Sequence, residues 1–196
     1  MTAPEPVWGL VLAGGKSRRM GSDKALLRQD GETQLSRAVT MLQEQLERVF
    51  ISTRADQADD VERRKFSRIV DRYDDMGPVA GILSAMDTHS EVSWLVLACD
   101  LPNIDAATIA HLLQHCSAEH VATAYESVHD GLPEPLCAIY RPASRTVIDT
   151  FVGQGMACPR KMLINSDTCL LAQPNPGALH NINSPADLAG TGIESV

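Results

Sequence analysis

The sequence lacks the paired cysteine motifs that bind zinc or exchange disulfides. Its five cysteines are widely spaced and none forms C-x-x-C, which excludes a zinc knuckle and a thioredoxin-type motif. No apolar run approaches the roughly 20 residues that span a bilayer. The amino terminus, MTAPEPVWG, has no basic region followed by an apolar one, so we expect no signal peptide. The odd number of cysteines and the absence of a signal favour reduced thiols, and we expect a cytoplasmic protein.

The chain also lacks an excess of basic residues. Its formal net charge of -8 argues against broad binding to nucleic acid or to an anionic membrane. Against this background a basic cluster stands close together in the chain. It consists of Lys16, Arg18, Arg19, Lys24 and Arg28. Such a cluster on an acidic protein indicates a small anionic ligand; the alternative is a solvated loop with scattered charges.

Most of this cluster lies in the segment LAGGKSRRMGSDK, residues 12–24, which also holds three glycines. The segment is not a P-loop, because position 10, where that motif needs its first glycine, is Leu. It is not the dinucleotide fingerprint either, because Gly14 and Gly15 are adjacent and Gly21 is six positions further on. Adjacent glycines let backbone N–H groups approach an anion closely. The segment therefore predicts a phosphate site of another kind.

Strands and helices alternate through the first half of the chain. We expect strands at Val7–Leu12, Val49–Thr53, Arg68–Val70 and Trp94–Asp100. One helix face is expected from the apolar residues Leu35, Val39, Leu42, Leu46 and Val49. Further helices are expected at Asp56–Lys65, which would be exposed to solvent, and from Gly77–Pro78 onward. Another is expected after the capping residue Asp105, with Ile109, Leu112, Leu113 and Cys116 on one face. This alternation predicts an α/β layered fold with a mostly parallel sheet.

The second half is less regular. We expect strands at 121–127 and 135–140, a helix at Ser144–Val152, another from Pro159, and a capping box at Ser184–Asp187. We see no linker, and expect one domain over residues 1–196.

Three of the expected strand ends carry residues suited to a ligand. They are Gly14–Gly15, Asp71 and Asp100, and in a parallel sheet these ends meet at one edge, where ligands bind. Asp100 ends an apolar strand, where a carboxylate is costly unless it is paired, solvated or bound to a cation. It is either a Mg²⁺ ligand or a turn cap that bonds the backbone near Pro102. The neighbouring basic loop favours the metal.

Other patterns indicate no chemistry. His111 and His115 have a zinc-binding spacing but lack the glutamate of a metalloprotease, so we expect them on the exposed face of a helix. Cys99 is expected to be a small buried hydrophobe. No G-x-S-x-G elbow supports Ser-His-Asp chemistry.

Five stretches together resemble the molybdenum cofactor guanylyltransferase family. They are LAGGKSRRMGSDK, GPVAGILSAM, LACDLPNI, PEPLCAIY and HNINSPADL, between Gly9 and Leu188. The resemblance implies a three-layer Rossmann-like nucleotidyltransferase fold. It also implies GTP and Mg²⁺, with molybdopterin or molybdenum-molybdopterin as the acceptor and pyrophosphate as the second product. Cofactor-delivery chaperones and molybdoenzymes are the further partners it implies.

The resemblance and the patterns above assign roles to individual residues. Nucleotide binding is expected at Leu12, Ala13, Gly14, Gly15, Lys24, Ser52, Asp71, Gly77, Pro78, Gly81 and Asp100. Catalysis is expected from Arg19, Lys24 and Asp100, and metal binding from Asp100 and Asn183. Acceptor binding is expected at Asn181 and Asn183 and at the basic pair Arg160 and Lys161. Residues 1–117 would then form the nucleotide-binding half and 118–196 the acceptor-binding half. Ser52 departs from the family, because relatives can carry Asn there.

Two alternatives remain open at this stage. One is another nucleotidyltransferase, which uses CTP or a sugar phosphate. Sugar-phosphate enzymes usually show GGxGTRL, whereas Ser17 and Met20 stand here in place of its third Gly and its Leu. The other is a nucleotide-binding regulator without catalysis, against which the presence of Arg19, Lys24 and Asp100 argues.

Overall fold

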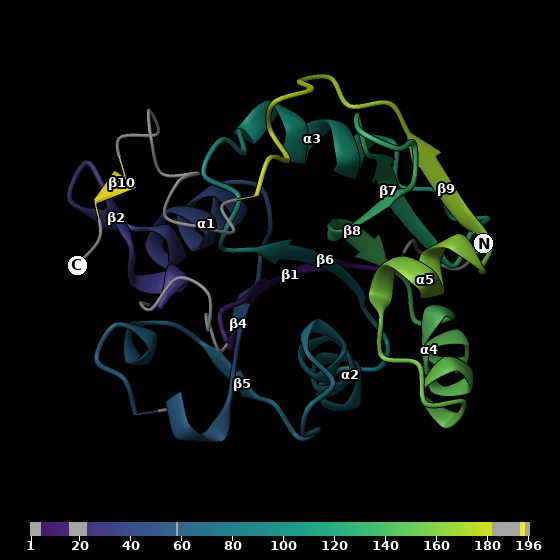
Figure 1. Cartoon of the computed structure of the whole chain (residues 1–196), viewed down its shortest axis with the longest axis horizontal. Helices are drawn as coiled ribbons and strands as arrows, with labels where there is room; N and C mark the ends of the chain where they lie inside the picture. Colours follow the sequence, from purple (N-terminus) through teal and green to yellow (C-terminus); the bar gives the residue numbers. More distant parts are fainter. Residues whose placement is uncertain (1–4, 16–22, 58, 182–192, 195–196) are drawn as a thin grey trace.

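A seven-stranded sheet forms the centre of the molecule (Figure 1). The computed structural model describes residues 5–15, 23–57, 59–181, 193 and 194. The strands of the sheet are, in spatial order, β5 (Arg68–Val70), β4 (Val49–Thr53), β1 (Val7–Leu12), β6 (Ser93–Ala98), β8 (Pro133–Tyr140), β7 (Ala122–Glu126) and β9 (Thr168–Leu171). Neighbouring strands are parallel except where β8 pairs with β6 and β7. The sheet is mostly parallel, as the sequence predicts.

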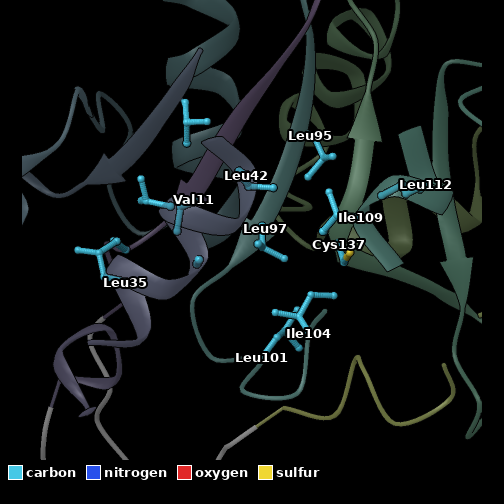
Figure 2. Close-up of a cluster of buried hydrophobic side chains, with 14 of the residues drawn as sticks. Val11, Leu35, Leu42, Leu95, Leu97, Leu101, Ile104, Ile109, Leu112 and Cys137 are labelled. Carbon is cyan, nitrogen blue, oxygen red and sulfur yellow. The ribbon is translucent and has the colours of Figure 1, made fainter. Parts of the chain in front are cut away.

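Helices cover both faces of this sheet and make three layers (Figure 1). One face carries α1 (Gln34–Gln43) and α3 (Ala106–Gln114), and the other carries α2 (Pro78–Thr88), α4 (Ser144–Gly153) and α5 (Pro159–Ile164). Figure 2 shows the first interface, where Leu35 and Leu42 of α1 and Ile109 of α3 lie near strand residues such as Val11 and Leu97. Burial of these apolar side chains is the main force that holds the layers together. The predicted α/β fold class is confirmed.

The strand register brings the residues that are predicted to bind a ligand to one edge of the sheet. Leu12 at the end of β1 lies opposite Ser52 of β4 on one side and Ala98 of β6 on the other. The residues that follow these strand ends, Gly14 and Asp100 among them, therefore leave the sheet at the same level.

Two element predictions are wrong. The helix α1 ends at Gln43, because Val49 pairs with Gly9 as the start of β4 and cannot share a helix face with Leu46. The described residues between 56 and 65 do not form an exposed helix. They form two 3₁₀ turns, η2 (Ala55–Gln57) and η3 (Arg63–Lys65), because the Asp60 carboxylate accepts the backbone N–H groups of Glu62 and Arg63 and competes with helical bonding.

The remaining elements follow the expected pattern closely. Asp105 caps α3 by accepting the backbone N–H of Thr108, although the helix ends before Cys116. The capping box at 184–187 lies outside the described residues. A small sheet pairs β10 (Ile193–Glu194), β2 (Arg28–Gln29) and β3 (Glu32–Thr33). All five cysteines are free thiols, and none of the helices in the described ranges has the length and apolar character needed to cross a membrane.

Candidate functional site

A cavity of about 870 Å³ opens at the edge of the sheet where β1, β4, β5 and β6 end. The first turn of α2 and Leu136 of β8 complete its wall. The predicted site residues that line this cavity are Leu12, Ala13, Gly14, Gly15, Lys24, Ser52, Asp71, Gly77, Pro78 and Asp100. The cavity therefore brings together residues from four strand ends and one helix start. These residues lie up to 88 positions apart in the sequence.

An ion pair between Lys24 and Asp100 lies in this cavity. Lys24 Nζ donates to Asp100 Oδ2 over 3.1 Å, and the two side chains are only 17% and 19% exposed. Lys24 begins the 3₁₀ turn η1 (Lys24–Leu26), which Asp23 caps by accepting the backbone N–H of Ala25. The other carboxylate oxygen, Asp100 Oδ1, is buried and has no hydrogen-bond partner among the described residues. In that part of the chain Asp100 also accepts no bond from the backbone near Pro102, so the turn-cap alternative has no contact to support it.

A second carboxylate, that of Asp71, also lines the cavity. Ser52 Oγ donates a 2.6 Å hydrogen bond to Asp71 Oδ1. Burial raises the pKa of Asp71 above its ordinary value of 3.8, although the Ser52 hydrogen bond and the nearby Arg54 oppose the shift. The Asp71 carboxylate is therefore held in one orientation at a cost in solvation.

Gly81 does not line the cavity but lies behind it, where α2 packs against the sheet. A Cβ atom on Gly81 would lie 2.3 Å from Ser52 Oγ and 3.0 Å from Leu12 Cδ2. Glycine therefore lets the helix approach the strands that carry Ser52 and Leu12. Gly81 therefore allows close packing and makes no direct contact with the cavity.

We predict that Asp71→Asn raises the thermal stability of the protein at neutral pH. The variant keeps an oxygen that can accept the Ser52 hydrogen bond but removes the poorly solvated charge. Because the pKa of Asp71 is raised in the folded state, wild-type stability falls as pH rises from 3.8 through the shifted pKa. The melting temperatures of the two proteins, measured across this range, should therefore diverge as pH rises. Equal melting temperatures at every pH would contradict the prediction.

Two arginines at the site are not predicted from the sequence. Arg54 follows β4, lines the cavity, donates to the Gly14 carbonyl oxygen over 3.4 Å and pairs with Asp56. Its position after a strand end, like that of Asp71, is a signal that could have found it. Arg63 lies behind the cavity wall, buried at 1% exposure, and donates to the Ala13 carbonyl oxygen. Its highly charged sequence neighbourhood gave no sign of burial.

The lining that the structure describes is acidic. Its carboxylates belong to Asp23, Asp56, Asp71, Asp74, Asp75 and Asp100, whereas its basic residues are Lys24 and Arg54. Lys24 and Arg54 are both engaged with carboxylates. A polyanionic ligand at this wall therefore requires a cation to accompany it, or positive charge from residues outside the described ranges.

Several predicted residues are not placed at the cavity. Arg160 lies on α5 and pairs with Glu134 over 2.9 Å and with Asp130 over 3.2 Å, while Lys161 is exposed. Neither lines the cavity, and Asn181 is exposed as well. Arg19 and Asn183 lie outside the described residues.

Within the part of the chain that the structure describes, the histidine pair forms no metal site with other residues. His111 Nδ1 lies 3.0 Å from the Tyr125 hydroxyl, which donates to the Thr108 carbonyl, and His115 is exposed. Across the described ranges no group of three or more His, Cys, Asp or Glu side chains could hold a metal ion. Cys99 is largely enclosed beside the core, and burial raises the pKa of its thiol.

The chain is similar in sequence to proteins that are named for the molybdenum cofactor. The chain is 38% identical over 182 residues to a molybdenum cofactor biosynthesis bifunctional protein of Synechocystis; the match covers 93% of this chain and 52% of that protein, about half its length. It is 31% identical to a probable molybdenum cofactor guanylyltransferase of Trichormus variabilis, over 92% of this chain and 87% of that protein.

The fold has relatives among solved structures. Molybdopterin-guanine dinucleotide biosynthesis protein A from Archaeoglobus fulgidus superposes with a TM-score of 0.76 at 22% identity, and the match covers 94% of this chain and 96% of that one. This confirms the Rossmann-like nucleotidyltransferase fold. The family model for the MobA-like NTP transferase domain matches residues 9–169. The chain therefore belongs to the family of MobA-like NTP transferases, which confirms the resemblance noted in the sequence.

Proposed function

We propose that this protein transfers GMP from GTP to molybdopterin, or to molybdenum-molybdopterin, with release of pyrophosphate. The observation that carries the proposal is the partly buried Lys24–Asp100 pair in a glycine-lined cavity at the sheet edge, with one Asp100 oxygen unpartnered in the described part of the chain. Family membership supports nucleotidyl transfer, and the names of the relatives support guanine and the molybdenum cofactor.

The nucleotide is proposed to lie against the first-half loops. Backbone groups of residues 12–15 contact it, and Gly14 and Gly15 permit close approach. Lys24 and Arg19 neutralise negative charge as pyrophosphate leaves. Gly77 and Pro78, at the start of α2, contact the nucleotide through their backbone. Ser52 acts indirectly, because its hydroxyl is already used to orient Asp71.

Mg²⁺ fits the chemistry of the Asp100 position. A hard divalent cation takes carboxylate and phosphate oxygens, and Asp100 Oδ1 is a buried carboxylate oxygen that lacks a hydrogen-bond partner in the described residues. The acidic lining also favours a nucleotide that arrives with a cation. When bound, the ion withdraws charge from the phosphates. We propose Asp100 as its protein ligand, with Asn183 as a second.

The transfer needs no protein base. The terminal phosphate of molybdopterin is already anionic at neutral pH, so its oxygen can attack the α-phosphorus of GTP directly. A phosphorus–oxygen bond forms as the bond to the β-phosphate breaks, and the electron pair leaves with pyrophosphate. The protein contributes orientation and charge stabilisation.

The acceptor is proposed to approach from the second half of the chain. Residues 1–117 would then act as the nucleotide half and 118–196 as the acceptor half of one domain. Arg160, Lys161, Asn181 and Asn183 remain the proposed acceptor residues. Because Arg160 is paired with Glu134 and Asp130, an anionic acceptor would have to compete with these carboxylates for its guanidinium group. We further propose a cytoplasmic location, with cofactor-delivery chaperones and molybdoenzymes as partners.

We predict that GTP binds more tightly than CTP, ATP or UTP. Close backbone contacts at Gly77 and Pro78 suit recognition of one base by shape and hydrogen bonding. Calorimetric titration of the four nucleotides in the presence of Mg²⁺ tests this directly. Tighter binding of CTP than of GTP would indicate a cytidylyltransferase instead. Nucleotide binding without pyrophosphate release would indicate a regulator.

A further inference from the structure

Arg63 is the one charged residue that is buried among those the structure describes, at 1% exposure. Its Nη2 atom donates two hydrogen bonds of 2.7 Å, one to the Ala13 carbonyl oxygen and one to Asp23 Oδ2. Ala13 directly precedes the glycine pair and Asp23 directly precedes Lys24. One guanidinium group therefore holds together the residue before the glycine pair and the residue before Lys24.

We propose that Arg63 is a positioning residue for nucleotide binding, which acts by holding Ala13 and Asp23, and with them the neighbouring Gly14 and Lys24, in register. The proposal rests on the proposed function, because it takes Gly14, Gly15 and Lys24 to contact the nucleotide. Groups that are already held in the geometry a ligand needs lose less conformational freedom when the ligand binds. Arg63 does not line the cavity, so its effect must pass through the residues it holds.

A series of contacts leads from Arg63 to the Lys24–Asp100 pair. Asp23 uses one carboxylate oxygen for Arg63 and the other for the backbone N–H of Ala25. That second bond caps the turn η1, whose first residue is Lys24. Lys24 in turn donates to Asp100. Loss of Arg63 would thus release the carboxylate that fixes the turn from which Lys24 reaches its partner.

The environment of Arg63 is built for a guanidinium group. Asp60 lies 3.5 Å from its Nη1 atom, and Gln57 donates to the same Asp23 oxygen over 3.4 Å. Asp60 is itself held by the backbone N–H groups of Glu62 and Arg63. The planar guanidinium group can interact with one carbonyl and two carboxylates in fixed directions, whereas the ammonium group of a lysine cannot hold the same geometry.

The test compares Arg63→Met and Arg63→Lys with Arg64→Met. Arg64 is the matched control, because it lies next in the chain and pairs with Asp59 over 3.0 Å but on the surface, at 57% exposure. Thermal unfolding is measured first, and GTP affinity is then measured with Mg²⁺ by calorimetry, well below each melting temperature. We expect Arg63→Met to weaken GTP binding by about tenfold or more, as for loss of hydrogen bonds to charged groups. Arg63→Lys should fall between it and wild type, and Arg64→Met should match wild type.

A lower melting temperature with wild-type GTP affinity in folded Arg63→Met would overturn the proposal and leave Arg63 a purely structural residue. Molybdopterin affinity serves as a second readout and should not change, because the described contacts of Arg63 include none of the proposed acceptor residues. If Arg63→Met fails to fold, Asp23→Asn breaks the same link from a side chain that is 26% exposed, and wild-type GTP affinity in that variant would equally overturn the proposal.

The proposed function can fail separately. Wild-type protein that binds GTP but transfers no GMP would overturn the proposed function, while the comparison of variants would still decide the role of Arg63. Wild-type protein that binds no nucleotide would overturn both.

Discussion

Asp100→Asn is expected to lower the rate of GMP transfer by about 10²- to 10³-fold, the range typical for loss of one preorganised electrostatic group. The change keeps the shape of the side chain and removes its charge. An amide oxygen binds Mg²⁺ more weakly than a carboxylate does, and Lys24 loses the partner that holds it at 3.1 Å. Pyrophosphate release measures the rate, and circular dichroism with thermal unfolding checks that the variant is folded.

The control for this variant is Asp59→Asn, the same chemical change at an aspartate that is 91% exposed and does not line the cavity. It should leave pyrophosphate release unchanged, because surface ion pairs contribute little. Normal turnover by folded Asp100→Asn would show that the Asp100 carboxylate has only a structural role and that the proposed metal position is wrong.

Gly81→Ala is expected to destabilise the fold by about 1–3 kcal/mol, the usual cost of overpacking a core. The added methyl group would lie 2.3 Å from Ser52 Oγ and 2.9 Å from Ser52 Cβ, so either α2 or the strand must shift. If the Ser52 hydroxyl rotates away instead, the hydrogen bond that orients Asp71 is lost. Chemical denaturation reports the change in the free energy of unfolding, and GTP titration reports the effect on the site.

A matched glycine-to-alanine change at Gly153 separates crowding from a general effect of the substitution. Gly153 is the last residue of α4, and a Cβ atom there meets nothing within 4 Å, so Gly153→Ala should be neutral or slightly stabilising. Ser52→Ala combined with Gly81→Ala should cost less than the sum of the two single changes, because the closest contact disappears. An unchanged free energy of unfolding for Gly81→Ala would show that α2 can move without cost.

Apolar strands were the part of the fold most readily predicted from sequence. A run such as that of β6, buried at every position, has few alternatives in a folded chain. The ends of these strands then located Gly14, Asp71 and Asp100 at one edge, because parallel strands bring their carboxyl ends together. The cavity at that edge follows from this topology.

The predictions that failed, and the residues that were missed, depend on contacts between distant parts of the chain. Nothing in the local sequence distinguishes Arg63 from its exposed neighbours Arg64 and Lys65, since its burial depends on Ala13 and Asp23. The apolar spacing typical of a helix continues to Val49 in the sequence, but Val49 pairs with Gly9 in the sheet and therefore belongs to a strand. The sequence around Arg160 likewise gives no sign of its ion pairs, because Glu134 and Asp130 lie 26 and 30 positions away in the chain.

The most direct test of the central claim is the identity of the product. Purified protein is incubated with Mg²⁺, molybdopterin and GTP labelled at the α-phosphate, with equimolar CTP labelled differently as a competitor. We predict that the guanosine label appears in a molybdopterin dinucleotide whose mass equals that of molybdopterin plus GMP less water, with one pyrophosphate released for each. A product that carries the cytidine label, or no dinucleotide despite bound GTP, would contradict the account.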